Sequence, residues 1–136
     1  ADSLKQALEA IKHIVKNDRK IYTVFGCGGD RDKTKRPIMG SIAEQLSDYC
    51  FLTSDNPRTE DPLEILKDIE LGMTSSNKYE VIEDREKAIK SAIENSEEDA
   101  VILIAGKGHE NYQEINGIRN YFSDKEIAKK YMWLWK

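Results

Sequence analysis

Two kinds of apolar pattern alternate along the chain. Short runs of consecutive apolar residues predict buried strands. They lie at residues 20–25, 49–53, 79–82 and 100–105. Apolar residues at every third or fourth position predict amphipathic helices. They lie near residues 4–15, 37–47, 62–73 and 84–93, and after residue 124. Strands that alternate with helices favour a parallel sheet joined by right-handed crossovers. The run at 100–105 is the most apolar, so we expect it in the centre of the sheet.

A different pattern follows the last of these strands. Residues 112–122 are centred on Asn116-Gly117, and Asn-Gly is the strongest two-residue signal for a hairpin. We therefore expect one domain, residues 1–136, with a Rossmann-like α/β fold. Its mostly parallel sheet should be flanked by helices and carry a C-terminal β-hairpin at one edge.

Composition narrows the class of protein. The net charge of −4 gives no reason to expect a nucleic acid or an anionic membrane surface as a partner. No apolar run approaches the about 20 residues of a membrane span. Cys27 and Cys50 lie in or beside predicted strands, which suggests reduced core thiols in a cytoplasmic protein. The local cluster of basic residues at 31–36 favours an anionic small molecule.

Three loops follow three of the predicted parallel strands and should meet at the same edge of the sheet. They are residues 26–36, 54–59 and 106–110. Ligands of α/β proteins bind beyond the carboxyl ends of the strands. The glycines of the first loop allow a tight turn there. We therefore expect the charged residues of the three loops to converge on a ligand.

Familiar nucleotide and metal motifs are incomplete. In G-x-G-x-x-G the third glycine packs helix against strand, and Arg31 stands in its place. The sequence contains no G-x-x-x-x-G-K-[ST] phosphate loop, so we do not expect this chain alone to bind ATP. His13 and His109 have no partner at metal-ligand spacing, so no metal site is expected.

Recognition of a zwitterion suits the loops better. Arg31 and Arg58 carry planar guanidinium groups that can hold carboxylates through two hydrogen bonds. Asp55 and Glu110 can accept hydrogen bonds from ammonium groups, and Asn56 can donate and accept. The plainer alternative is that residues 30–36 form a solvated loop with local ion pairs.

Three segments resemble the motifs of one family. Residues 25–37, 55–58 and 105–110, in this order and spacing, resemble the C-terminal domain of the Mur ligases, which build the stem peptide of peptidoglycan. The similarity extends over residues 1–130. In that family the Asp-Asn-Pro-Arg motif marks members that add meso-diaminopimelate, and lysine-adding relatives replace the arginine. Arg58 therefore implies meso-diaminopimelate, whose second carboxylate is absent from lysine.

The resemblance also implies a set of binding residues for the amino acid. These are Arg31, Asp55, Asn56, Arg58, Gly106 and Glu110, with Lys107 and His109 as secondary candidates. Glu110 would hold an ammonium group, Gly106 would act through its backbone, and Asp55 would shape the motif loop. No catalytic residue is expected in this chain.

The family's reaction requires further domains. An acyl phosphate is formed from ATP on UDP-N-acetylmuramoyl-L-Ala-D-Glu, and the amine of the incoming amino acid attacks it. The UDP-binding and ATP-binding domains, with ATP and Mg, are expected upstream of this chain, so the chain alone should be inactive. Two alternatives stay open. One is a free-standing Rossmann-like module for a nucleotide or an acidic metabolite, and the other is a structural domain that does not contact the amino acid.

Overall fold

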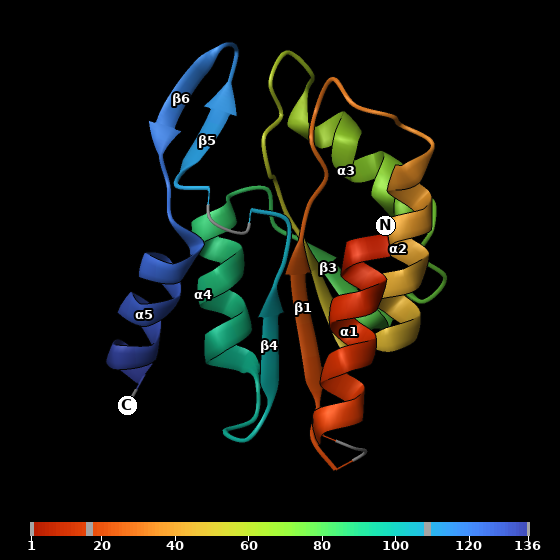
Figure 1. Cartoon of the computed structure of the whole chain (residues 1–136), viewed down its shortest axis with the longest axis vertical. Coiled ribbons are helices and arrows are strands. Elements are labelled where there is room, and N and C mark those ends of the chain that lie inside the picture. Colours follow the sequence, from red (N-terminus) through yellow and green to blue (C-terminus); the bar gives the residue numbers. More distant parts are fainter. Residues whose placement is uncertain (1, 16–17, 108–109, 136) are drawn as a thin grey trace.

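The computed structural model describes residues 2–15, 18–107 and 110–135 (Figure 1). The elements, in order, are α1 (Asp2–Val15), β1 (Ile21–Phe25), α2 (Lys35–Leu46), β2 (Tyr49–Leu52), α3 (Pro62–Glu70), the 3-10 helix η1 (Ser76–Lys78), β3 (Tyr79–Val81), α4 (Arg85–Asn95), β4 (Val101–Ile104), β5 (Tyr112–Ile115), β6 (Ile118–Tyr121) and α5 (Asp124–Trp135). None of the helices in these ranges is long and apolar enough to cross a membrane.

A four-stranded parallel sheet forms the centre of the molecule. Its strand order is β3-β2-β1-β4, and Val24 in β1 pairs with Phe51 of β2 and Ile104 of β4. One face is covered by α1, α2 and α3, and the other by α4 and α5 (Figure 1). The predicted α/β fold, with helices on both faces of a parallel sheet, is confirmed.

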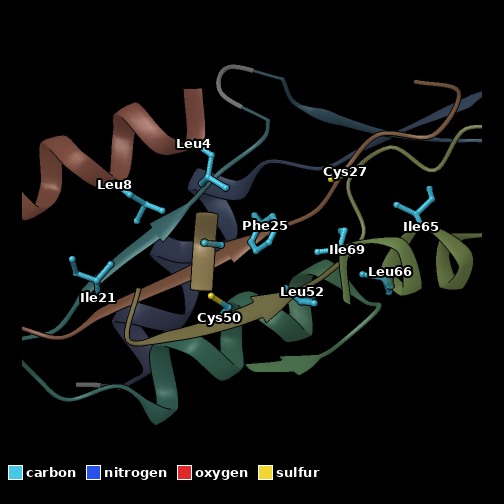
Figure 2. Close-up of a cluster of buried hydrophobic side chains, with 11 residues drawn as sticks. Leu4, Leu8, Ile21, Phe25, Cys27, Cys50, Leu52, Ile65, Leu66 and Ile69 are labelled. Carbon is cyan, nitrogen blue, oxygen red and sulfur yellow. The ribbon is translucent and has the colours of Figure 1, made fainter. Parts of the chain in front are cut away.

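Side chains of the strands alternate between two apolar clusters. Figure 2 shows the first cluster, where Phe25 and Leu52 lie with Leu8 of α1 and Ile69 of α3. The second cluster joins Val24 and Phe51 to one face of α4. The period-two alternation of a strand therefore fixes which helices each strand residue contacts.

The predicted central position of residues 100–105 is wrong. β1 is flanked on both sides, by β2 and β4, whereas β4 lies at the end of the strand order. Leu103 packs against the first cluster, and Ile102 and Ile104 pack against the second. The strand is apolar because helices cover both of its faces. Helices can cover both faces of an edge strand as well as of a central one, so an apolar run does not distinguish the two positions.

The predicted hairpin is present and forms a sheet of its own. β5 and β6 pair antiparallel, and Asn116 and Gly117 take positive φ angles of 51° and 78° in the turn. The hairpin lies beyond the carboxyl ends of the main strands (Figure 1). A parallel bridge joins Arg58 to Ile115. The hairpin therefore contacts the second predicted site loop instead of extending the main sheet.

A buried arginine fastens the carboxyl edge of the sheet to α5. Arg85, 1% exposed, donates from Nε and Nη2 to the two carboxylate oxygens of Asp124 at 2.8 and 2.7 Å. It also donates to the carbonyls of Ser54 and Ala105 at 3.2 and 3.0 Å. Such paired, charge-assisted bonds are the strong ones. They tie the start of the second loop and the residue before the third loop to α5.

Both cysteines are buried free thiols, as the sequence predicted. Burial raises the pKa of Cys27 to about 11 and that of Cys50 to about 12. Both thiols are therefore protonated near neutral pH, which makes them poor nucleophiles.

Candidate functional site

The first and second loops lie against each other through their backbones. The N–H of Gly29 donates to the carbonyl of Asn56 at 2.7 Å. A Cβ added at Gly26 would lie 2.1 Å from the carbonyl oxygen of Thr53, and one at Gly29 would lie 1.9 Å from that of Pro57. Only glycine allows this approach, because a methyl group at either position would overlap with main-chain atoms that cannot move aside.

Asn56 connects the second loop to the third loop and to the hairpin. Its side chain is buried, with the residue 2% exposed. Its Oδ1 accepts from Lys107 Nζ at 3.2 Å and from the Glu114 N–H at 2.8 Å. Its Nδ2 donates to Glu110 Oε1 at 3.2 Å. One amide group therefore contacts both the third loop and the hairpin, each more than 50 residues away in the sequence.

Arg58 is held in an unusual conformation beside these contacts. Its φ is 52°, a left-handed value that costs a non-glycine residue about 1 kcal/mol or more. The hairpin compensates, since the Arg58 N–H donates to the Glu114 carbonyl at 3.0 Å and the Asn116 N–H donates to the Arg58 carbonyl at 2.8 Å. The guanidinium Nη1 donates to the Gly29 carbonyl at 3.0 Å, and Nε lies 3.8 Å from Glu114 Oε1.

A second arginine lies beside the first. The position of a Cβ at Gly28 is 2.8 Å from Arg58 Nη1 and 3.5 Å from Arg31 Cγ, so both side chains lie over this glycine. Arg31 is exposed, and its Nη1 donates to the Asp30 carbonyl at 3.3 Å. Arg58 is mostly buried, with a side chain 18% exposed. The two arginines give this edge of the sheet a local positive charge suited to a carboxylate.

The basic cluster at 31–36 does not face a ligand as a whole. Arg36 is buried at 1% exposed and pairs with Glu60 and Asp68, each at 2.9 Å. It also donates to the Gly28 carbonyl at 3.0 Å. The expectation of an anion-binding cluster is therefore wrong for Arg36, which turns inward and holds the first loop to the region of α3.

The remaining predicted residues occupy the third loop and the start of the motif loop. Lys107 Nζ lies 3.1 Å from Asp55 Oδ1, and both side chains are largely buried. Gly106 has a φ of 115°, and a Cβ there would lie 3.6 Å from Asp55 Oδ2. His109 lies outside the described residues. The structure thus brings Asp55, Asn56, Gly106, Lys107 and Glu110 together. Arg58 lies on the same loop as Asp55 and Asn56, and Arg31 lies on the first loop.

Two hairpin residues that the sequence did not single out complete the site. Gln113 Nε2 donates to the Asp55 carbonyl at 2.8 Å, and Glu114 contacts both Asn56 and Arg58. No local signal marks these residues, because each contact joins positions more than 50 apart in the chain. From the sequence alone, Gln113 and Glu114 would be interpreted as solvent-exposed strand residues. Their contacts become apparent only from the position of the hairpin in the fold.

Comparison with known proteins identifies the family. The family described as "Mur ligase, glutamate ligase domain" matches residues 1–108. The chain belongs to the Mur ligases. The UDP-N-acetylmuramoyl-L-alanyl-D-glutamate--2,6-diaminopimelate ligase of Buchnera aphidicola is 54% identical over 129 residues, which are 95% of this chain and 25% of that protein. The enzyme of the same name from Fusobacterium nucleatum is 53% identical, over 95% of this chain and 26% of that protein.

One solved structure agrees with this assignment, and a second shares the fold. A structure titled as the same ligase superposes with a TM-score of 0.90 at 45% identity, over 98% of this chain and 27% of that chain. A murein peptide ligase from Psychrobacter arcticus has a TM-score of 0.59 at 15% identity, covering 96% of this chain and 24% of that chain, and shares the fold alone. This Mur ligase chain thus spans about a quarter of the length of these relatives.

The two loop glycines predict contrasting effects of an added methyl group. Gly28→Ala meets the end of a flexible arginine, so we expect a stability loss below about 1 kcal/mol and a displaced Arg58 guanidinium. Gly29→Ala meets a backbone carbonyl and should cost about 2 kcal/mol or more. Urea unfolding of both variants measures the difference. Equal losses would contradict the loop packing described above.

Glu60 predicts a pH-dependent contribution to stability. The Arg36 guanidinium, followed by the Asp30 N–H, lowers the pKa of Glu60 from 4.5 to about 2. A carboxyl group whose pKa is lower in the folded than in the unfolded chain stabilises the folded chain at pH values above the ordinary pKa. This stabilisation is lost as the pH falls from about 5 towards 2. At about 1.4 kcal/mol per unit, and allowing for solvent, it amounts to about 2 kcal/mol at pH 7.

Urea unfolding of Glu60→Gln at pH 7 and pH 3 measures that contribution. We expect the loss relative to the unaltered chain to be about halved at pH 3. The control is Glu64→Gln, because Glu64 is a largely exposed carboxylate of α3 whose ion pair should contribute under about 0.5 kcal/mol at either pH. A Glu60 effect that stays constant with pH would show that its charge is not what stabilises the loop.

Proposed function

We propose that this chain is the amino-acid-binding part of an ATP-dependent ligase that adds meso-diaminopimelate to UDP-N-acetylmuramoyl-L-Ala-D-Glu. Membership of the Mur ligases and the names of the relatives support the reaction. One geometric observation supports the site: Arg31 and Arg58 lie side by side over Gly28, next to the hydrogen-bonded pair of buried Asn56 and half-buried Glu110.

The chemistry of the ligand fits these groups. Each end of meso-diaminopimelate carries a carboxylate and an ammonium group. The guanidinium of Arg58 is fixed by Gly29 and Glu114, so it is preorganised to pair with a carboxylate. Glu110 can receive an ammonium group. L-Lysine lacks one carboxylate, and a site with a guanidinium built for that group discriminates against the analogue that leaves it unpaired.

In such a ligase this chain would act by orientation. The acceptor's carboxyl group becomes an acyl phosphate at the expense of ATP, and the amine of meso-diaminopimelate attacks its carbonyl carbon as phosphate leaves. Holding the amine at a fixed position would speed the reaction, because the entropy cost of bringing the two reactants together is then met on binding. The residues of this chain are assigned no part in making the acyl phosphate.

ATP and Mg²⁺ are not assigned to this chain. The sequence has no G-x-x-x-x-G-K-[ST] phosphate loop. In residues 2–15, 18–107 and 110–135, no group of three or more His, Cys, Asp or Glu side chains could hold a metal ion. The proposal therefore places ATP, Mg²⁺ and the UDP-linked dipeptide on other parts of a longer ligase, like those of the relatives.

Arg58→Lys tests the proposal. Isothermal titration of the unaltered chain should show meso-diaminopimelate binding at least tenfold more tightly than L-lysine. Lysine at position 58 keeps the charge but loses the planar fork, so the preference should fall by about ten- to a hundredfold. The matched control is Arg119→Lys, because Arg119 is an exposed hairpin arginine that also pairs with Glu114. It should keep the preference.

Two outcomes of this titration would contradict the proposal. An unchanged preference in Arg58→Lys would show that Arg58 does not contact the ligand and would favour a structural domain. Binding of ATP, without any heat from meso-diaminopimelate, would instead favour a nucleotide-binding module.

A further inference from the structure

Lys107 has surroundings that a ligand-binding lysine would not have. Its side chain is fully buried, with 0% of its surface exposed. The ammonium donates to the Tyr112 carbonyl at 2.8 Å and to Asn56 Oδ1 at 3.2 Å, and it lies 3.1 Å from Asp55 Oδ1. An ammonium group has three N–H donors. Two of these donors are used by Tyr112 and Asn56, and Asp55 Oδ1 lies against the ammonium at ionic distance. Because the side chain is also fully buried, the ammonium is not open to a ligand.

The contact of Lys107 with Asn56 determines which way the Asn56 side-chain amide points. The two ends of an asparagine amide have nearly the same shape but opposite hydrogen-bonding character. Two donors, Lys107 Nζ and the Glu114 N–H, converge on one end, which must therefore be the carbonyl oxygen. The NH₂ group is thereby directed at Glu110 Oε1. Without the lysine, one main-chain donor alone would hold the carbonyl in place.

The contact with Asp55 explains why a charged lysine is tolerated in this position. Oδ1 of Asp55 is buried and accepts no hydrogen bond, although Lys107 Nζ is only 3.1 Å away. The angle is poor for a hydrogen bond, so the attraction is ionic. Each charge compensates the other, as buried ionised groups require.

We propose that Lys107 is a positioning residue: it acts on the amino-acid site through the Asn56 amide and does not contact the amino acid itself. This inference rests on the proposed function for its ligand, meso-diaminopimelate. The orientation of Asn56 can be measured without any ligand, so the two can fail separately.

The first test compares single and double variants at positions 55 and 107. Lys107→Met alone leaves Asp55 buried and uncompensated, so it is compared with Asp55→Asn and with the double variant Asp55→Asn/Lys107→Met, which keeps the net charge at −4. Asp55→Asn measures how far loss of the carboxylate alone lowers the affinity for meso-diaminopimelate. The double variant should bind meso-diaminopimelate at least tenfold more weakly than Asp55→Asn. Lys125→Met, at an exposed position of α5, serves as the neutral control.

The second test reads the Asn56 amide directly by NMR in the chain without ligand. In the unaltered chain the two Nδ2 protons should be well separated in frequency, and one should show a nuclear Overhauser contact to Glu110. In the double variant this contact should be lost while the fold, judged by the core amide signals, is retained. A merely structural role for Lys107 would change stability but leave this contact in place.

Either test can overturn the inference. Full affinity in the double variant, or an unchanged Asn56–Glu110 contact, would show that the lysine does not position Asn56. If the double variant does not fold, the unaltered chain decides, because buried and bonded Lys107 ammonium protons should exchange with water slowly enough to be observed. Fast exchange, or a direct Overhauser contact between Lys107 and meso-diaminopimelate, would contradict the positioning role.

If the unaltered chain binds no meso-diaminopimelate, the proposed function fails and the Asn56 contact alone decides the inference.

Discussion

The loops at the carboxyl edge of this sheet meet at one buried side chain, that of Asn56. Asn56 bonds to Lys107 and Glu110 of the third loop, to Glu114 of the hairpin, and through its backbone carbonyl to Gly29 of the first loop. A buried polar group that lacks a partner costs about 1–3 kcal/mol, so loss of either the side-chain or the backbone contacts would be penalised. The positions of the three loops are therefore coupled, and a change in one should be felt at the others.

The cations of this edge divide into two groups with different tasks. Arg36, Arg85 and Lys107 are buried and neutralised by carboxylates, and each also donates to a main-chain carbonyl of another segment. They fix the loops, and removing one would leave an uncompensated carboxylate. Arg31 and Arg58 lie nearer the surface over Gly28. This division explains how a chain with a net charge of −4 can present two arginines at this edge that its buried ion pairs do not use.

Much of this arrangement follows from the sequence, and the exceptions have physical reasons. The strands, the helices and the meeting of three loops follow from apolar periodicity and from the rule for parallel strands. The edge position of β4 does not, because burial on both faces gives the same apolar run in a central strand. The inward turn of Arg36 depends on Glu60 and Asp68, which lie 24 and 32 residues away. The contact of the hairpin with Arg58 is likewise a long-range pairing that no local pattern encodes.

The central claim is that the three loops form one binding site for meso-diaminopimelate, and amide NMR with this amino acid tests it most directly. Titration of the labelled chain should shift signals of the first loop around Gly28 and Arg31, of Asn56 and Arg58, and of Glu110, and should leave the far ends of the strands unchanged. Shifts confined to another surface would contradict the account. One such surface is the groove lined by Ile102 and Ile104 of β4 and by Ala128 and Met132 of α5. A chain whose signals do not respond at any concentration of meso-diaminopimelate would contradict it as well.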